Sequence, residues 1–107
     1  MAHPEIQRTF EKLWQLHVAK DADYAGQQPL SNFRACERFG VPAWKGALIR
    51  MSDKWSRLMS LMEKDGPDVE GESLEDTLDD LAVYAVIVKV LRKEKKQPPG
   101  SWKEVGR

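Results

Sequence analysis

The acidic residues of this 107-residue chain are concentrated in one segment. Nine of its seventeen Asp and Glu residues fall between Glu63 and Asp80, where Lys64 is the only base. Glu72, Asp76 and Asp80 are spaced i, i+4, i+8, which would place three carboxylates on one face of a helix that has begun by Glu72. Like charges at this spacing repel each other unless a cation neutralises them. The row therefore indicates a site for a divalent metal such as Mg²⁺, which prefers carboxylates, waters and phosphates as ligands.

A purely structural explanation of these acids is also open. Acids in the first turn of a helix interact favourably with its macrodipole, which would account for Glu72, Glu75 and Asp76. Asp79 and Asp80 lie too far along the sequence for that explanation, and they stand between apolar residues. These two acids favour the functional hypothesis.

A second charged set, Arg50, Asp53, Lys54 and Arg57, flanks the apolar stripe of the preceding helix. Asp53 and Arg57 are four residues apart, so an exposed surface pair is one interpretation. In the functional interpretation, Asp53 joins the metal cluster from across the bundle, and Lys54 and Arg57 bind phosphate oxygens. Glu37 is a further candidate ligand, with a surface position as its alternative.

Helices are expected to position these residues. Apolar residues from Ile6 to His17 recur at three- and four-residue steps after Pro4, which predicts an amphipathic helix of about four turns. Residues 21–31 contain glycine and proline and predict a loop long enough to touch a ligand. A short helix or turn is expected over residues 32–39.

Two further long helices are expected. One starts after Val41, with Pro42 in its first turn, and runs to about Lys64. The other starts between residues 69 and 73 and runs to about Lys95. Their expected core-facing stripes are Leu48, Met51, Trp55, Leu58 and Met62 in the first and Leu74, Leu78, Leu81, Ala85, Val88 and Leu91 in the second.

Ser73 and Asp76 have the spacing of a capping pair. If they form one, Glu72 lies just outside the last helix. No strand alternation or internal repeat is present, so the predicted class is all-α, with three long helices and a short one. Residues 1–96 are expected to form the domain and residues 97–107 a C-terminal tail.

Composition limits the partners. The 17 basic and 17 acidic residues cancel, which removes the electrostatic basis for binding duplex nucleic acid. Cys36 is the one cysteine, and the sequence shows neither a signal peptide nor an apolar run of membrane-spanning length. These features predict a cytoplasmic protein without a membrane partner.

Oligomerisation is expected because three long helices make an incomplete bundle and a chain of this size buries little surface alone. The four tryptophans are also more aromatic surface than so small a core needs. The interface is expected to bury some of Trp44, Trp55, Met59 and Met62.

Four segments together resemble a known family: DADYA (21–25), PLSNF (29–33), RMSDKWSRL (50–58) and ESLEDTLDDLAVYA (72–85). They resemble the nucleotide-modification-associated domain of phages and bacteria, which belongs to the MazG-like all-α nucleoside triphosphate pyrophosphohydrolases. The last two segments are the most specific. The resemblance implies a helical bundle completed as a homodimer, often paired into a homotetramer. It also implies Mg²⁺- or Mn²⁺-dependent hydrolysis of a ribo- or deoxynucleoside triphosphate between its α- and β-phosphates.

The resemblance also implies roles for individual residues. The implied metal-binding acids are Asp53, Glu72, Asp76 and Asp80. Glu72 or Asp80, when not engaged by metal, would orient the attacking water or take its proton. Lys54 and Arg57 would stabilise charge on the departing pyrophosphate. Better-known members carry Glu-Glu-x-x-Glu on the second helix, where this chain has only Asp53, so the number of metal ions stays open.

A base and sugar pocket would come from Asp23, Tyr24, Asn32 and Phe33, although Phe33 also suits a core position. The link to nucleotide modification suggests a purine deoxynucleotide such as dGTP as substrate, in a bacterial or phage-infected cell. A related diphosphate hydrolase is one alternative. The other is a non-catalytic helical adaptor or assembly protein whose acidic helix docks on a basic partner.

Overall fold

The computed structural model describes residues 1–22, 30–63 and 73–95. Within these ranges the chain is helical and contains no strand, which confirms the all-α prediction. It divides into two units, Met1–Ser31 and Asn32–Arg107. None of the helices in the described ranges is both long enough and apolar enough to cross a membrane.

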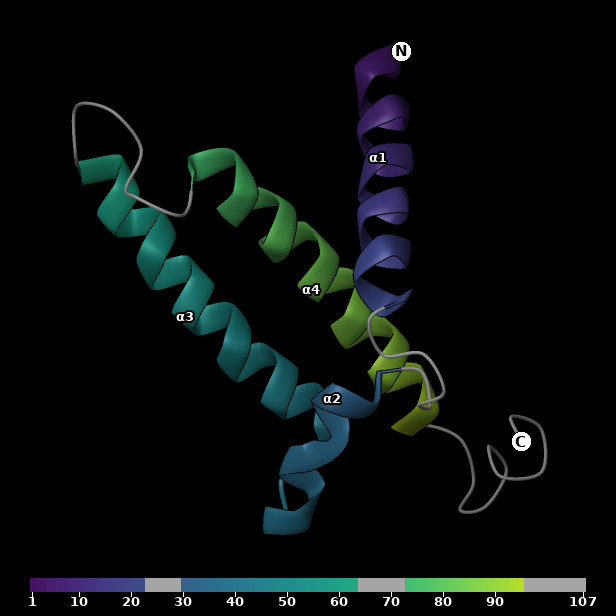
Figure 1. The fold of residues 1–107 in the computed structure, drawn as a ribbon, viewed down its shortest axis with the longest axis vertical. Helices are drawn as coiled ribbons and strands as arrows, with labels where there is room; N and C mark the ends of the chain where they lie inside the picture. The colour runs from purple at the N-terminus through teal and green to yellow at the C-terminus, as the bar shows by residue number, and fades with distance from the viewer. Residues whose placement is uncertain (23–29, 64–72, 96–107) are drawn as a thin grey trace. The chain divides into compact units, whose positions relative to one another are not determined.

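The first unit is built on helix α1, Pro4–Asp21 (Figure 1). The proline stands in the first turn, where its missing N–H costs no hydrogen bond, as predicted. His3 caps the helix, because its Nδ1 accepts a hydrogen bond of 3.1 Å from the backbone N–H of Glu5. The expected loop begins later than predicted, since α1 includes Asp21, and residues 23–29 lie outside the described residues.

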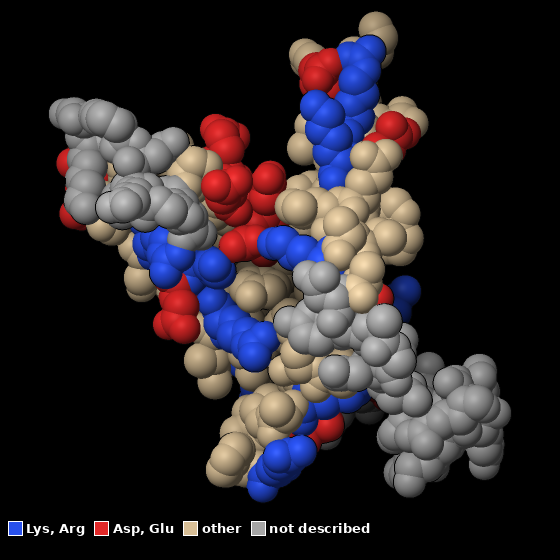
Figure 2. Space-filling view, viewed as in Figure 1, with Lys and Arg blue, Asp and Glu red and all other residues tan. Residues whose placement is uncertain are grey.

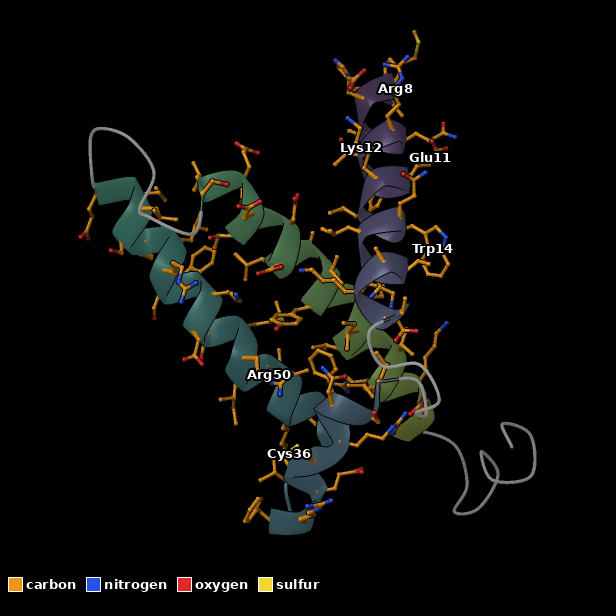
Figure 3. All side chains as sticks on the ribbon, viewed as in Figure 1. Arg8, Glu11, Lys12, Trp14, Cys36 and Arg50 are labelled. Atoms are coloured by element: carbon orange, nitrogen blue, oxygen red, sulfur yellow. The ribbon has the colours of Figure 1, made fainter. Side chains whose placement is uncertain are left out.

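The apolar side chains of α1 form one exposed stripe. Ile6, Phe10, Trp14 and Val18 follow each other at four-residue steps, and each is exposed. Figure 3 shows Trp14 projecting from the helix, and its ring centroid lies 6.1 Å from that of His17. The amphipathic pattern read from the sequence is therefore a real face of this helix.

Two short elements follow, the α2 helix Ser31–Arg34, whose first residue ends the first unit, and the 3₁₀ helix η2, Ala35–Phe39. They occupy the segment where a short helix or turn is predicted. Gly40 ends η2 with a φ of 79°, and its N–H donates to the Glu37 carbonyl at 3.0 Å. A residue without a Cβ adopts this left-handed conformation without steric cost.

Two long helices, α3 (Ala43–Glu63) and α4 (Leu74–Lys95), run antiparallel and pack along each other (Figure 1). The carbonyl of Pro42 accepts hydrogen bonds from the N–H groups of Lys45 and Gly46, so the proline stands immediately before the first turn. Among the described residues, the buried ones are Phe33, Ala43, Ala47, Leu58, Thr77, Ile87, Val88 and Leu91. This core lies mainly between the two long helices.

The face of α3 that packs on α4 is offset from the predicted stripe. Leu58 is buried as expected, but Trp55 and Met62 are 56% and 63% exposed. The small residues Ala43 and Ala47 are buried instead. Small side chains let α4 approach closely along this face, which favours it over the stripe of larger residues.

A similar offset occurs on α4. Val88 and Leu91 are buried as predicted, but Leu78 and Ala85, also predicted to face the core, are exposed, and Thr77 is fully buried. The Thr77 hydroxyl donates to the Ser73 carbonyl at 3.1 Å, so its own helix satisfies this buried polar group. On both helices, the buried face therefore overlaps the predicted stripe only in part.

Candidate functional site

One edge of the α3–α4 hairpin carries charges of both signs. Arg50, Lys54 and Arg57 lie one turn apart along α3, and Asp76 and Asp80 lie one turn apart on α4. Figure 2 shows Lys and Arg side chains following α3 and Asp and Glu side chains over the first half of α4. These five residues are called the charged edge below.

Lys54 and Asp80 join the two helices across this edge. The Lys54 Nζ lies 2.9 Å from the Asp80 Oδ2, and the two side chains are only 23% and 20% exposed. An ion pair that is four-fifths buried is held in a defined geometry, unlike a solvated surface pair. The structure thus brings together two residues that the sequence proposed for one site from separate helices.

Asp76 has a structural task at the start of α4. Its backbone N–H donates to the Ser73 Oγ at 3.0 Å, and its Oδ2 accepts from the Ser73 N–H at 3.4 Å. This reciprocal pair confirms the predicted capping box, in which Ser73 is the N-cap and α4 begins at Leu74. Asp76 is exposed, one turn before Asp80.

The predicted row of three carboxylates depended on where α4 begins. The helix starts two residues after Glu72, so helical spacing does not place that residue beside Asp76. Glu72 itself lies outside the described residues, as do Asp23 and Tyr24 of the expected base pocket.

Asp53 and Glu37 are both exposed. Asp53 precedes Lys54, so it leaves α3 about 100° away from the residue that reaches Asp80. Among the described residues, no three His, Cys, Asp or Glu side chains come together as a metal-binding group. The structure therefore does not assemble Asp53 with Asp76 and Asp80.

The candidate metal ligands that remain on the charged edge are the carboxylates of Asp76 and Asp80. Mg²⁺ is often held by one or two protein carboxylates, with waters and substrate phosphates completing its shell. Two carboxylates one helical turn apart, beside cationic side chains, fit that mode of binding. They do not fit a closed site made of protein ligands alone.

At the α2 end of the charged edge, Phe33 is a core residue. It is 7% exposed, and the Tyr84 ring meets it edge-on with centroids 5.5 Å apart and planes at 84°. The Arg50 guanidinium carbon lies 4.8 Å from the Phe33 centroid, and Arg50 Nη2 donates to the Asn32 carbonyl at 3.4 Å. The sequence left open whether Phe33 lines the base pocket or packs in the core. Its burial agrees with a core position.

Arg50 belongs to the charged set noted in the sequence, but no role in the site was predicted for it. Figure 3 shows it on α3 close to α2. Its spacing of four residues from Lys54 was the available signal, because it puts both cations on one side of α3. Its contact with Phe33 joins residues seventeen positions apart, and no local pattern indicates such a contact.

The α2 end of the hairpin is held by further charged and aromatic contacts. Arg34 Nη2 lies 2.7 Å from the Glu94 Oε2, which ties α2 to the last turns of α4. Arg92 and Lys45 lie over the Trp44 ring at 4.7 and 5.4 Å. These contacts fix the end of α4 against the start of α3, and with it the position of α2.

The opposite edge of the hairpin is apolar. By helical spacing, six exposed apolar residues lie on this side of the hairpin: Leu48, Trp55, Met59 and Met62 on α3 and Leu78 and Ala85 on α4. These six residues are called the apolar edge below. Three of the four residues predicted for an interface belong to it; the fourth, Trp44, is half-buried.

The hairpin thus has one edge suited to an anionic ligand with a cation and another suited to packing against protein. Comparison with known proteins finds no family model that matches the chain, no similar curated protein and no similar solved structure.

Proposed function

We propose that this chain is a MazG-like nucleoside triphosphate pyrophosphohydrolase, which cleaves a ribo- or deoxynucleoside triphosphate to the monophosphate and pyrophosphate. The supporting observation is the charged edge, where Lys54 of α3 and Asp80 of α4 meet at 2.9 Å. A triphosphate needs cationic side chains for its oxygens and carboxylates for the divalent cation that accompanies it. Both are available within one short stretch of the hairpin.

Each residue of the charged edge has a role in this proposal. Lys54 and Arg57 bind phosphate oxygens, Lys54 as a compact charge and Arg57 as a planar fork. Asp76 and Asp80 would hold Mg²⁺ or Mn²⁺. When bound, the cation neutralises phosphate charge and makes a water molecule more acidic.

The Lys54–Asp80 pair compensates two of the charges on this edge. Without a ligand, each group neutralises the other in a partly buried position where an unpaired charge is costly. When a triphosphate binds with its cation, Lys54 gains phosphate oxygens and Asp80 gains the cation. The two charges stay compensated throughout. By the family resemblance, the carboxylate that does not hold the cation, which is Glu72 when Asp80 holds it, orients the water that attacks the α-phosphorus.

A second copy of the chain completes the bundle in this proposal, giving a homodimer that can pair into a homotetramer. The apolar edge supports it, because Trp55 and Met62 on α3 and Leu78 on α4 are large side chains that gain from burial. Burial of a side chain of this size is worth about 1.5–3 kcal/mol. The hairpin edge opposite the charges is then the interface.

The test is hydrolysis by the purified protein of each common ribo- and deoxynucleoside triphosphate with Mg²⁺ or Mn²⁺. The expected products are monophosphate and pyrophosphate, with dGTP as the expected substrate. Orthophosphate as the product would instead indicate a diphosphate hydrolase. No metal-dependent hydrolysis of any nucleotide would refute the proposal and favour a non-catalytic adaptor.

The matched variants are Asp80→Asn and Glu75→Gln. Both remove one negative charge from the first half of α4, but Glu75 is exposed and lies on the side of the helix away from α3. Asp80→Asn should abolish hydrolysis and Glu75→Gln should leave it near normal. Equal loss in both would mean that general negative charge, and not a site, supports the activity.

A further inference from the structure

The guanidinium of Arg50 lies over an aromatic ring at the α2 end of the charged edge. Its carbon is 4.8 Å from the centroid of the Phe33 ring. The hydrogen bond to the Asn32 carbonyl at 3.4 Å further limits its rotation. Arg50 as a whole is exposed.

We propose that Arg50 is a platform for the base of the bound nucleotide, which stacks on the side of its guanidinium turned away from Phe33. The inference rests on the proposed function and gives the base a different partner from the one the sequence suggested. The Phe33 ring is buried beneath Arg50 and against Tyr84, so it supports the platform and does not touch the ligand. Arginine planes stack on nucleobases as aromatic rings do.

The platform sets the direction in which the nucleotide lies. Arg50, Lys54 and Arg57 follow each other along α3, and the first and last are about 10 Å apart along the helix axis at 1.5 Å per residue. With the base on Arg50, the phosphates extend toward Lys54 and Arg57. That direction brings the phosphates to Asp80, which Lys54 contacts.

The chemistry of arginine makes the inference testable by a conservative change. Lysine keeps the positive charge at position 50 but has no plane to stack. Arg50→Lys should therefore weaken binding of a ligand that has a base and leave binding of a bare phosphate chain unchanged. A simple phosphate-binding role for Arg50 predicts a similar small effect on both ligands.

Arg92→Lys is the matched control. Arg92 lies over the Trp44 ring at 4.7 Å, so the same change removes an arginine stacked on an aromatic ring. Arg92 is on α4 and does not belong to the charged edge. Any general effect of this kind of substitution on the fold will appear in this variant as well.

The experiment is calorimetric titration of wild type, Arg50→Lys and Arg92→Lys with two probes in Mg²⁺. One probe is the α,β-methylene analogue of dGTP, which cannot be cleaved at that bond, and the other is inorganic triphosphate. Arg50→Lys should bind the analogue about tenfold more weakly, within the range for loss of one stacking contact. Its affinity for inorganic triphosphate should match wild type, and Arg92→Lys should match wild type for both probes.

The outcomes that overturn the inference differ from those that overturn the proposed function. If wild type binds the analogue and Arg50→Lys binds it equally well, or loses both probes alike, Arg50 is not a base platform and the proposed function stands. If wild type binds neither probe, the proposed function fails and the inference fails with it.

Discussion

The ion pair between Lys54 and Asp80 allows a quantitative test of the charged edge. Exposed ion pairs contribute about 0.2–1 kcal/mol, whereas breaking a fully buried pair costs about 3–5 kcal/mol. With side chains 23% and 20% exposed and a distance of 2.9 Å, this pair lies between these limits. We expect a coupling free energy of about 1–2 kcal/mol from a double-mutant cycle.

The cycle consists of wild type, Asp80→Asn, Lys54→Met and the double variant. Asp80→Asn should cost the most, about 2 kcal/mol, because it leaves the Lys54 ammonium partly buried beside a neutral group. For a domain of this size that corresponds to a fall in Tm of about 10 °C. Lys54→Met keeps the packing of the aliphatic stem and should cost less.

Urea denaturation of the four proteins gives the coupling directly. If the losses in the single variants add to within about 0.3 kcal/mol in the double variant, the two groups do not interact and the reasoning is refuted. The same set tests the metal role. Mn²⁺ should raise the Tm of Lys54→Met more than that of wild type, because a competing cation has been removed from Asp80. Mn²⁺ should raise the Tm of Asp80→Asn least.

Three further variants follow from the structure. Asp76→Asn should abolish hydrolysis and also lower the free energy of unfolding by about 0.5–1 kcal/mol, measured by thermal melts, since its charge stabilises the start of α4. Gly46→Ala places a Cβ 2.5 Å from the Cys36 Sγ and should destabilise wild type. In a Cys36→Ala background, Gly46→Ala should raise the free energy of unfolding by about 1 kcal/mol, because alanine has the higher helix propensity. Urea denaturation measures this change. Trp55→Lys on the apolar edge should give a monomer by light scattering.

Each of these has a result that contradicts it. Near-normal turnover by Asp76→Asn would exclude that residue as a metal ligand. A stabilising effect of Gly46→Ala in the wild-type background would mean that Cys36 moves aside freely. A wild-type protein that is monomeric at micromolar concentration would contradict the role given to the apolar edge.

The stability effect of Asp76→Asn shows where the structure changes a conclusion drawn from sequence. Repulsion within a row of three carboxylates predicts that removing Asp76 raises the stability of the metal-free protein. Instead the residue completes a capping box with Ser73. Its charge stands at the positive end of the helix dipole, so we now expect the opposite sign.

Helix boundaries were the most predictable part of the fold. Pro4 starts α1, Gly40 ends η2 and Ser73 caps α4, each as expected from the sequence. Such signals act through backbone groups a few residues away, so the sequence alone contains them. The ion pair between Lys54 and Asp80 was not predicted, because the sequence placed both residues in one site but assigned Lys54 to phosphate and Asp80 to metal.

The packing faces were less predictable, for a physical reason. Each long helix offers two overlapping stripes, and the one that is buried depends on which gives the closer approach to the other helix. Ala47 on α3 and Thr77 on α4 decide this, although neither is a large apolar residue. Asp53 and Lys54 are neighbours on α3 and therefore point in different directions around the helix axis. Asp53 is exposed, whereas Lys54 reaches Asp80.

The antiparallel packing of α3 and α4 also has a kinetic consequence. The two helices that form most of the core follow each other along the chain, so their contacts close only a short loop. Folds dominated by such local contacts reach the native state in microseconds to milliseconds. The second unit should therefore refold quickly as one chain, and assembly through the apolar edge should follow as a slower step whose rate depends on protein concentration.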